Sequence, residues 1–75
     1  MPEAAFYEIR VEGHIHQRWS DWFSGLTISY LPTGETLLSG RLVDQAALHG
    51  VLMKIRDLRL VLVSVNRIEQ ENAII

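Results

Sequence analysis

Shortness is the strongest constraint on what this chain can fold into. It has 75 residues, which leaves room for one hydrophobic core and no second domain. Domains of this size bury only about 60 to 65% of the surface of the unfolded chain. A core below roughly 80 residues contributes just a few kcal/mol, so small domains commonly add disulfides, a structural metal or a partner chain. We therefore expect a single domain over residues 1–75 that uses one of these aids.

Composition leaves association as the aid that fits best. The chain has no cysteine, so disulfides are excluded and thiolate zinc sites have no ligands. Hydrophobic residues make up 48% of the chain and charged residues 21%, which is typical of a folded protein and not of a disordered one. We expect the chain to associate with itself, as a dimer first, or with another protein. No cofactor is predicted.

Charge and hydropathy predict neither a nucleic-acid partner nor a membrane partner. The formal net charge is −2, from seven basic and nine acidic residues, and these are scattered, so no basic patch for a polyanion is evident. No apolar run approaches the roughly 18 residues needed to cross a bilayer. The first residues also lack the basic and apolar pattern of an export signal, so a cytoplasmic protein is expected.

Alternation of apolar and polar residues predicts four strands. They lie at residues 7–13, 26–30, 36–42 and 60–65. In the first, Tyr7, Ile9 and Val11 alternate with charged residues, which is the period of a half-buried strand. Gly34 lies in a turn between the second and third strands. Gly40, inside the third, indicates either a bulge or a close approach from across the sheet.

Two helical segments are predicted. Asp44 is a suitable N-cap, and apolar residues after it recur with helical spacing, so we expect an amphipathic helix over residues 45–58. Arg59 stands at the exit of this helix, where glycine is commoner. A shorter helix is expected from three aromatic residues at helical spacing, Trp19, Trp22 and Phe23. One or two turns would gather these rings on one side before Gly25 ends the segment.

The order of these elements predicts an α+β fold. Strand, short helix, strand, hairpin, strand, long helix and strand is the ferredoxin-like split βαββαβ pattern with a very short first helix. It would form a four-stranded antiparallel sheet with one main helix on one face. A rival arrangement replaces the short helix by a loop. In either case one helix cannot cover both faces of four strands, so one sheet face is expected to be open.

The open face is the predicted interface. If the odd-numbered residues of the first strand face the helix, regular alternation places Leu60 and Leu62 on the opposite face. An apolar centre with a charged rim is typical of an interface, whereas scattered exposed leucines would need no partner. Gly50, in mid-helix, marks a point where a neighbouring chain could approach. The predicted interface residues are Leu37, Leu60, Leu62, Arg10, Arg41 and Gly50.

Small-ligand or metal binding is the second hypothesis. His14 and His16 are two residues apart, so in a strand both rings would project from one face beside Glu12. These three residues form a predicted metal half-site, although a closed site needs three or four convergent ligands and two solvated histidines are the alternative. A ligand pocket, if one is present, is expected among Trp19, Trp22, His14 and His16. The alternative for the aromatic rings is packing in the core.

Catalysis finds no support in the sequence, although an enzyme is not excluded. No serine lies in a Gly-x-Ser-x-Gly elbow and no phosphate-binding glycine loop occurs. Glu8 and Glu12 are four residues apart in a predicted strand, hence more than about 10 Å distant, which is too far for a retaining carboxylate pair. No catalytic residue is therefore predicted.

Several segments resemble a family of small uncharacterised bacterial proteins. They are VDQAALHG at 43–50, IRDL at 55–58 and VSV at 63–65, together with residues 7–14 and 19–23. The resemblance covers nearly the whole chain. It implies a bacterial cytosolic setting, and it transfers no activity and no catalytic residue. Members of such a family are expected to carry glycine where Arg59 stands.

Overall fold

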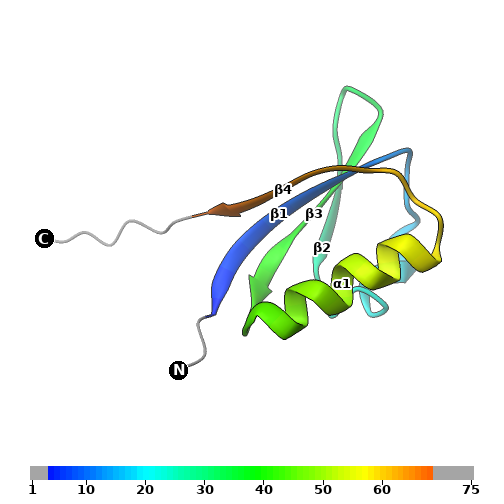
Figure 1. Ribbon diagram of the computed structural model, residues 1–75. Coiled ribbons are helices and arrows are strands. Elements are labelled where there is room, and N and C mark those ends of the chain that lie inside the picture. The colour runs from blue at the N-terminus through cyan, green and yellow to red at the C-terminus, as the bar shows by residue number, and fades with distance from the viewer. Residues whose placement is uncertain (1–3, 69–75) are drawn as a thin grey trace, which may run out of the picture.

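The four alternating segments form one antiparallel sheet, and the segment after Asp44 forms one helix against it (Figure 1). This computed structural model describes residues 4–68, so the terminal apolar residues 73–75 lie outside it. The elements are β1 (Ala5–Glu12), the 3-10 helix η1 (Gln17–Ser20), β2 (Thr27–Tyr30), β3 (Glu35–Leu42), α1 (Gln45–Asp57) and β4 (Leu62–Ile68). The predicted α+β class, with a four-stranded antiparallel sheet and one main helix, is confirmed.

The strands follow the spatial order β2-β3-β1-β4. β1 pairs with β3 over its whole length, from Ala5 opposite Leu42 to Glu12 opposite Glu35. Its other edge pairs with β4, and β3 also pairs with β2. The two edges of the sheet are therefore β2, with four residues, and β4, with seven.

The core lies between α1 and one face of the sheet. The buried residues are Tyr7, Ile9 and Val11 of β1, Ile28 of β2, Leu38 and Leu42 of β3, and Leu48, Val51 and Ile55 of α1, with Ile15, Phe23 and Leu26 from the segment between β1 and β2. Burial of one such side chain stabilises the fold by about 1.5–3 kcal/mol. The N-cap of α1 is the predicted one, because the Asp44 carboxylate accepts a hydrogen bond of 2.9 Å from the Ala47 N–H.

The aromatic segment forms a 3-10 helix of four residues in place of α-helical turns. η1 ends at Ser20, and the following turn reverses through Ser24 and Gly25, which both have positive φ. Helical hydrogen bonds continue beyond η1 as far as Phe23, whose N–H donates to the carbonyls of Trp19 and Ser20 at 3.1 Å. The three aromatic side chains nevertheless differ in burial. Phe23 is fully buried in the core, whereas 40% of the Trp22 surface is exposed.

The end of α1 is a Schellman motif formed without glycine. Arg59 adopts a left-handed φ of 59°, and its N–H donates to the Arg56 carbonyl at 2.8 Å. The Leu60 N–H donates to the Ile55 carbonyl at 3.1 Å. These are the two hydrogen bonds of the motif, which also brings together the side chains at the positions of Leu60 and Ile55. Leu60 accordingly packs against the core. The prediction from alternation, which placed Leu60 on the opposite face of the sheet, was therefore wrong.

A register shift in β4 reverses the predicted facing of Leu62. Arg10 pairs with Ser64, but the next residue of β1, Val11, pairs with Leu62. Val63 is therefore an extra residue, as in a β-bulge. Since directly paired residues share a face of the sheet and a shift of one residue exchanges the faces, Leu62 lies on the side of the buried Val11. The prediction that Leu62 lies on the open face was wrong.

Arg59→Gly is expected to stabilise the fold. A non-glycine residue in the left-handed region costs about 1–2 kcal/mol. Glycine removes this cost, but it also makes the unfolded chain more flexible, which lowers stability by about 0.5–1 kcal/mol. We expect a net increase of about 0.5–1 kcal/mol in the free energy of unfolding, measured by urea denaturation. Arg59→Ala is the control, because alanine removes the side chain and keeps the strain. Equal stability of the glycine and alanine variants would contradict the strained exit.

Gly40→Ala is expected to destabilise the fold. Gly40 lies opposite Tyr7 in an unbroken register, and a Cβ atom there would come within 2.8 Å of Cδ2 of the buried Leu26. Of the two predicted alternatives, a bulge and a close approach, the structure has the close approach. Overpacking of this kind costs about 1–3 kcal/mol. Gly50→Ala is the matched control: an added Cβ meets nothing within 4 Å, so about 0.5–1 kcal/mol should be gained in helix propensity. Unfolding free energies that change in the same direction would refute this account.

Candidate functional site

Glu12, His14 and His16 do not converge on one point. Gly13 has a φ of 86° and ends the strand geometry that would have aligned the two histidines. The His14 ring lies 4.7 Å from the Tyr30 ring, while His16 Nδ1 accepts a hydrogen bond of 3.0 Å from the Arg18 N–H at the start of η1. Among residues 4–68, no three His, Cys, Asp or Glu side chains gather into a group that could hold a metal ion. Metal binding by these three residues therefore stays a prediction that no convergent geometry supports.

Two hydroxyl groups hold the turn that carries these histidines. The fully buried Thr36 accepts a hydrogen bond of 3.1 Å from the Ile15 N–H and donates to the Gly13 carbonyl. Tyr30 donates to the Ile15 carbonyl at 2.6 Å. Sequence reasoning did not single out Thr36. The available signal was a threonine two residues before Leu38, on the core-facing alternation of β3, because a buried hydroxyl requires a partner.

The two predicted pocket tryptophans do lie together. The rings of Trp19 and Trp22 meet edge to face with centroids 5.9 Å apart. The Arg18 guanidinium carbon lies 5.8 Å from the centroid of Trp19, and Lys54 Nζ lies 5.3 Å from that of Trp22. A surface depression is lined by Arg18 and Trp19. The aromatic part of the predicted pocket is thus bordered by cations, which the sequence pattern did not indicate.

The predicted interface residues lie on different parts of the molecule. Arg10 is directly opposite Leu37 on the face away from α1, and Arg41 is opposite Phe6 on the same face. Most of their neighbours there are polar or charged, namely Glu8, Thr27, Ser29, Ser39, Ser64 and Asn66. Because Leu60 and Leu62 turn toward the core side, this face lacks the expected leucine cluster. Gly50 lies on α1.

Exposed apolar side chains gather instead along the edge of the sheet at β4. They are Val61, Leu62, Val63, Val65 and Ile68, with exposed fractions from 36 to 55%. α1 approaches β3 more closely than β4, so the helix leaves this edge uncovered, and Figure 1 shows β4 along the side of the sheet away from α1. β4 contains no proline and one charged residue, Arg67, so it has few of the features that usually protect an edge strand.

Comparison with known proteins identifies a family without an assigned activity. A family model described as a domain of unknown function, DUF8691, matches residues 6–66, which extend from β1 through most of β4. This confirms the expected resemblance to an uncharacterised family. No curated protein and no solved structure matches the chain at a significant level. Over the described residues, no helix is long and apolar enough to cross a membrane.

Thr36→Val is expected to destabilise the fold by about 1–3 kcal/mol. Valine fills the same space but leaves the Ile15 N–H and the Gly13 carbonyl without their partner, and a buried polar group without a hydrogen bond carries a penalty of that size. Chemical denaturation measures the effect. Thr27→Val, at an exposed position of β2, is the matched control and should change stability by no more than about 0.5 kcal/mol. Similar values for the two variants would show that the Thr36 hydrogen bonds are unimportant.

Proposed function

The chain belongs to the DUF8691 family of domains of unknown function, and from that premise we propose that it is a small homo-oligomeric interaction or regulatory module whose dimer forms through β4. The observation that carries this proposal is the exposed apolar edge from Val61 to Ile68. Covering this edge would add the apolar burial that a chain of 75 residues otherwise lacks. A second copy presents the same edge strand, so in a symmetric dimer each β4 covers the exposed edge of the other.

Antiparallel pairing of β4 with its own copy suits the order of its residues. The bulge at Val63 interrupts regular alternation, so the pairing is proposed for residues 63–67, centred on Val65. Val65 of one copy would then oppose Val65 of the other, and Ser64 would oppose Asn66. At these central positions apolar meets apolar and polar meets polar, which favours cross-strand contact, while at the outer positions Val63 of each copy opposes Arg67 of the other. The two copies of Arg67 stay apart in this register.

The ferredoxin-like topology belongs to the same proposal. β1 lies between β3 and β4, and β3 lies between β1 and β2, so each connection through a helix skips one strand. This is the arrangement of two interlocked split βαβ units. In it, η1 occupies the place of the first helix, shortened to four residues. The shortening supports the proposal because it leaves α1 as the main cover of the sheet.

A bacterial cytoplasmic setting without catalysis completes the proposal. A chain without cysteine needs no oxidising compartment to fold. The segments that resemble small bacterial proteins support the proposal that this protein is bacterial. The role proposed here requires a surface and a partner, and no reacting group.

Val63→Lys is expected to weaken dimerisation at least about tenfold. A lysine on an edge strand places a charge where the partner strand would pair, and a tenfold change corresponds to about 1.4 kcal/mol. Sedimentation velocity over a range of concentrations measures the dissociation constant. Val43→Lys is the control, because Val43 is exposed and lies outside β4. Leu62→Glu should also weaken the dimer, and circular dichroism checks that every variant is folded.

Two results would overturn the proposal. One is a wild-type chain that sediments as a monomer up to millimolar concentration. The other is a folded Val63→Lys variant that dimerises as well as Val43→Lys does. Gly50→Ala distinguishes this interface from one that includes α1, because it should leave the β4 dimer intact. Dissociation caused by that substitution would place the contact on the helix.

A further inference from the structure

We infer that Arg18, Trp19, Trp22 and Lys54 form a binding site for an acidic peptide segment that presents an apolar side chain between its carboxylates. The site is built from η1, the turn after it and the last turn of α1. It uses no residue of β4, so it is independent of the proposed dimer.

The apolar part of the site is a pair of indole rings held at two depths. Trp19 is partly buried and packs against the core, which fixes its position. Trp22 meets it edge to face and leaves 40% of its surface exposed. A rigid, half-exposed indole is a common anchor in protein recognition, since it offers a large contact area at small entropic cost. The depression lined by Arg18 and Trp19 gives an apolar side chain of the partner a place to enter.

Two cations border these rings. The Arg18 guanidinium and the Lys54 ammonium lie within 6 Å of the indole centroids, and such exposed cation–π contacts contribute about 0.5–1 kcal/mol. Each contact holds a positive charge beside an apolar surface. In the described part of the chain, neither cation forms an ion pair with a carboxylate of the protein. Arg56, by contrast, is paired with Asp57 at 3.2 Å.

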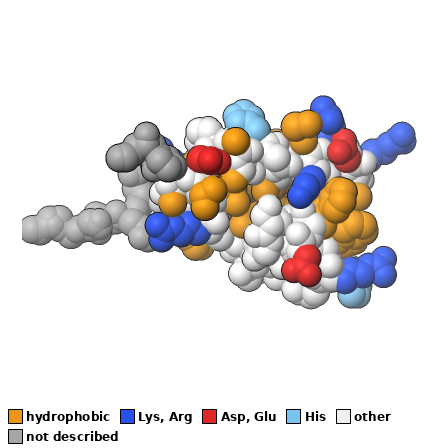
Figure 2. Space-filling model, turned by 90° about the horizontal axis from the view of Figure 1, so that it is seen from below, with side chains coloured by type: hydrophobic (Ala, Val, Ile, Leu, Met, Phe, Trp, Pro, Cys, Tyr) orange, Lys and Arg blue, Asp and Glu red, His pale blue; other side chains and the backbone are white. Residues whose placement is uncertain are grey.

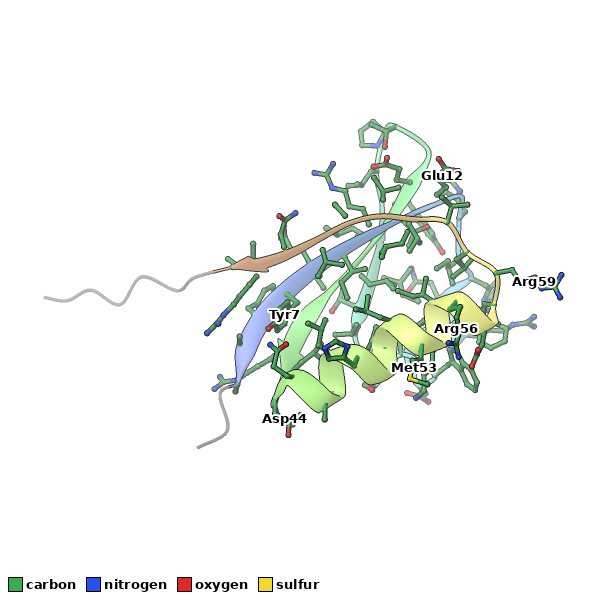
Figure 3. All side chains as sticks on the ribbon, viewed as in Figure 1. Tyr7, Glu12, Asp44, Met53, Arg56 and Arg59 are labelled. Atoms are coloured by element: carbon green, nitrogen blue, oxygen red, sulfur yellow. The ribbon has the colours of Figure 1, made fainter. Side chains whose placement is uncertain are left out.

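The surroundings add positive charge at the same end of the molecule. Figure 3 places Arg56 and Arg59 at the end of α1, with Met53 on the same stretch of the helix. Figure 2 shows basic side chains around a group of hydrophobic side chains at the end opposite the grey termini. Asp21, in the turn between the two tryptophans, is an exposed carboxylate nearby. Basic groups thus outnumber acidic groups here, although the whole chain carries a net charge of −2.

Charge complementarity selects the occupant. Carboxylates of the partner can pair with the Arg18 fork and with the Lys54 ammonium, while its apolar side chain packs against the two adjoining indole rings. A nucleic acid also stacks on aromatic rings and pairs with cations. The phosphates of a nucleic acid would, however, extend beyond this small site over the remaining surface of a chain with a net charge of −2. The repulsion between these negative charges is unfavourable for binding. The short acidic peptide therefore fits this small site better.

Tryptophan fluorescence tests the inference directly, because both tryptophans of the chain lie in the site. The probe is the peptide Ac-EFD-NH2, titrated into the full chain. We expect a saturable fluorescence change, with binding at least about fivefold weaker for the uncharged Ac-QFN-NH2 and for Ac-EAD-NH2, which lacks the ring; fivefold is about 1 kcal/mol. The double variant Arg18→Gln/Lys54→Gln should lose affinity by a similar factor. Arg41→Gln, which neutralises an exposed arginine of β3, is the matched control and should bind as the wild type does.

Three outcomes would overturn the inference. The first is no saturable change up to millimolar peptide. The second is equal affinity for the acidic and the uncharged peptide, which would show that the cations do not select the ligand. The third is tighter binding of oligothymidylate than of Ac-EFD-NH2, which would assign the site to nucleic acid. Val63→Lys should bind the peptide with unchanged affinity, because β4 is outside the site.

Discussion

The pairing of β1 with a neighbour on each side is the interaction on which the rest of the structure depends. β1 joins β3 along its whole length and β4 along most of it, and its inward residues Ile9 and Val11 are fully buried. α1 lies against β3 and shares the buried core with the inward residues of β1. The single long helix therefore completes the core over one half of the sheet, while β4 remains attached by its hydrogen bonds to β1 with little apolar cover.

Sequence reasoning was reliable where one periodic pattern determines an element by itself. The Asp44 cap, the helix after it and the alternation of β1 were all predicted. Gly40 was expected to mark either a bulge or a close approach, and the structure has the close approach. The facing of Leu60 and Leu62 was not predictable in the same way. It depends on the bulge at Val63 and on the left-handed Arg59, and neither residue type signals such a conformation.

The candidate sites show the same difference between features that a local sequence pattern determines and features that depend on distant segments. The spacing of His14 and His16 suggests a metal half-site only if the strand continues past Gly13, and the positive φ of that residue ends it. The two tryptophans were predicted to be close, and they are. Their cationic neighbour Lys54 comes from a helix more than thirty residues away in the chain, so no local pattern could reveal it. Contacts between distant segments were the information that the sequence lacked.

The unequal lengths of the two sheet edges determine whether further copies of the chain can extend the sheet. β2 presents four residues and β4 seven, and a short edge is a poor template for another strand. If copies join through β4, each uses its long edge on the other, and both outer rims of the combined sheet are then short. Such an assembly terminates itself. The strands left at its two ends are the four-residue β2 edges, which are poor templates for elongation into a fibre, while the longer and more apolar β4 edge is covered by its own copy.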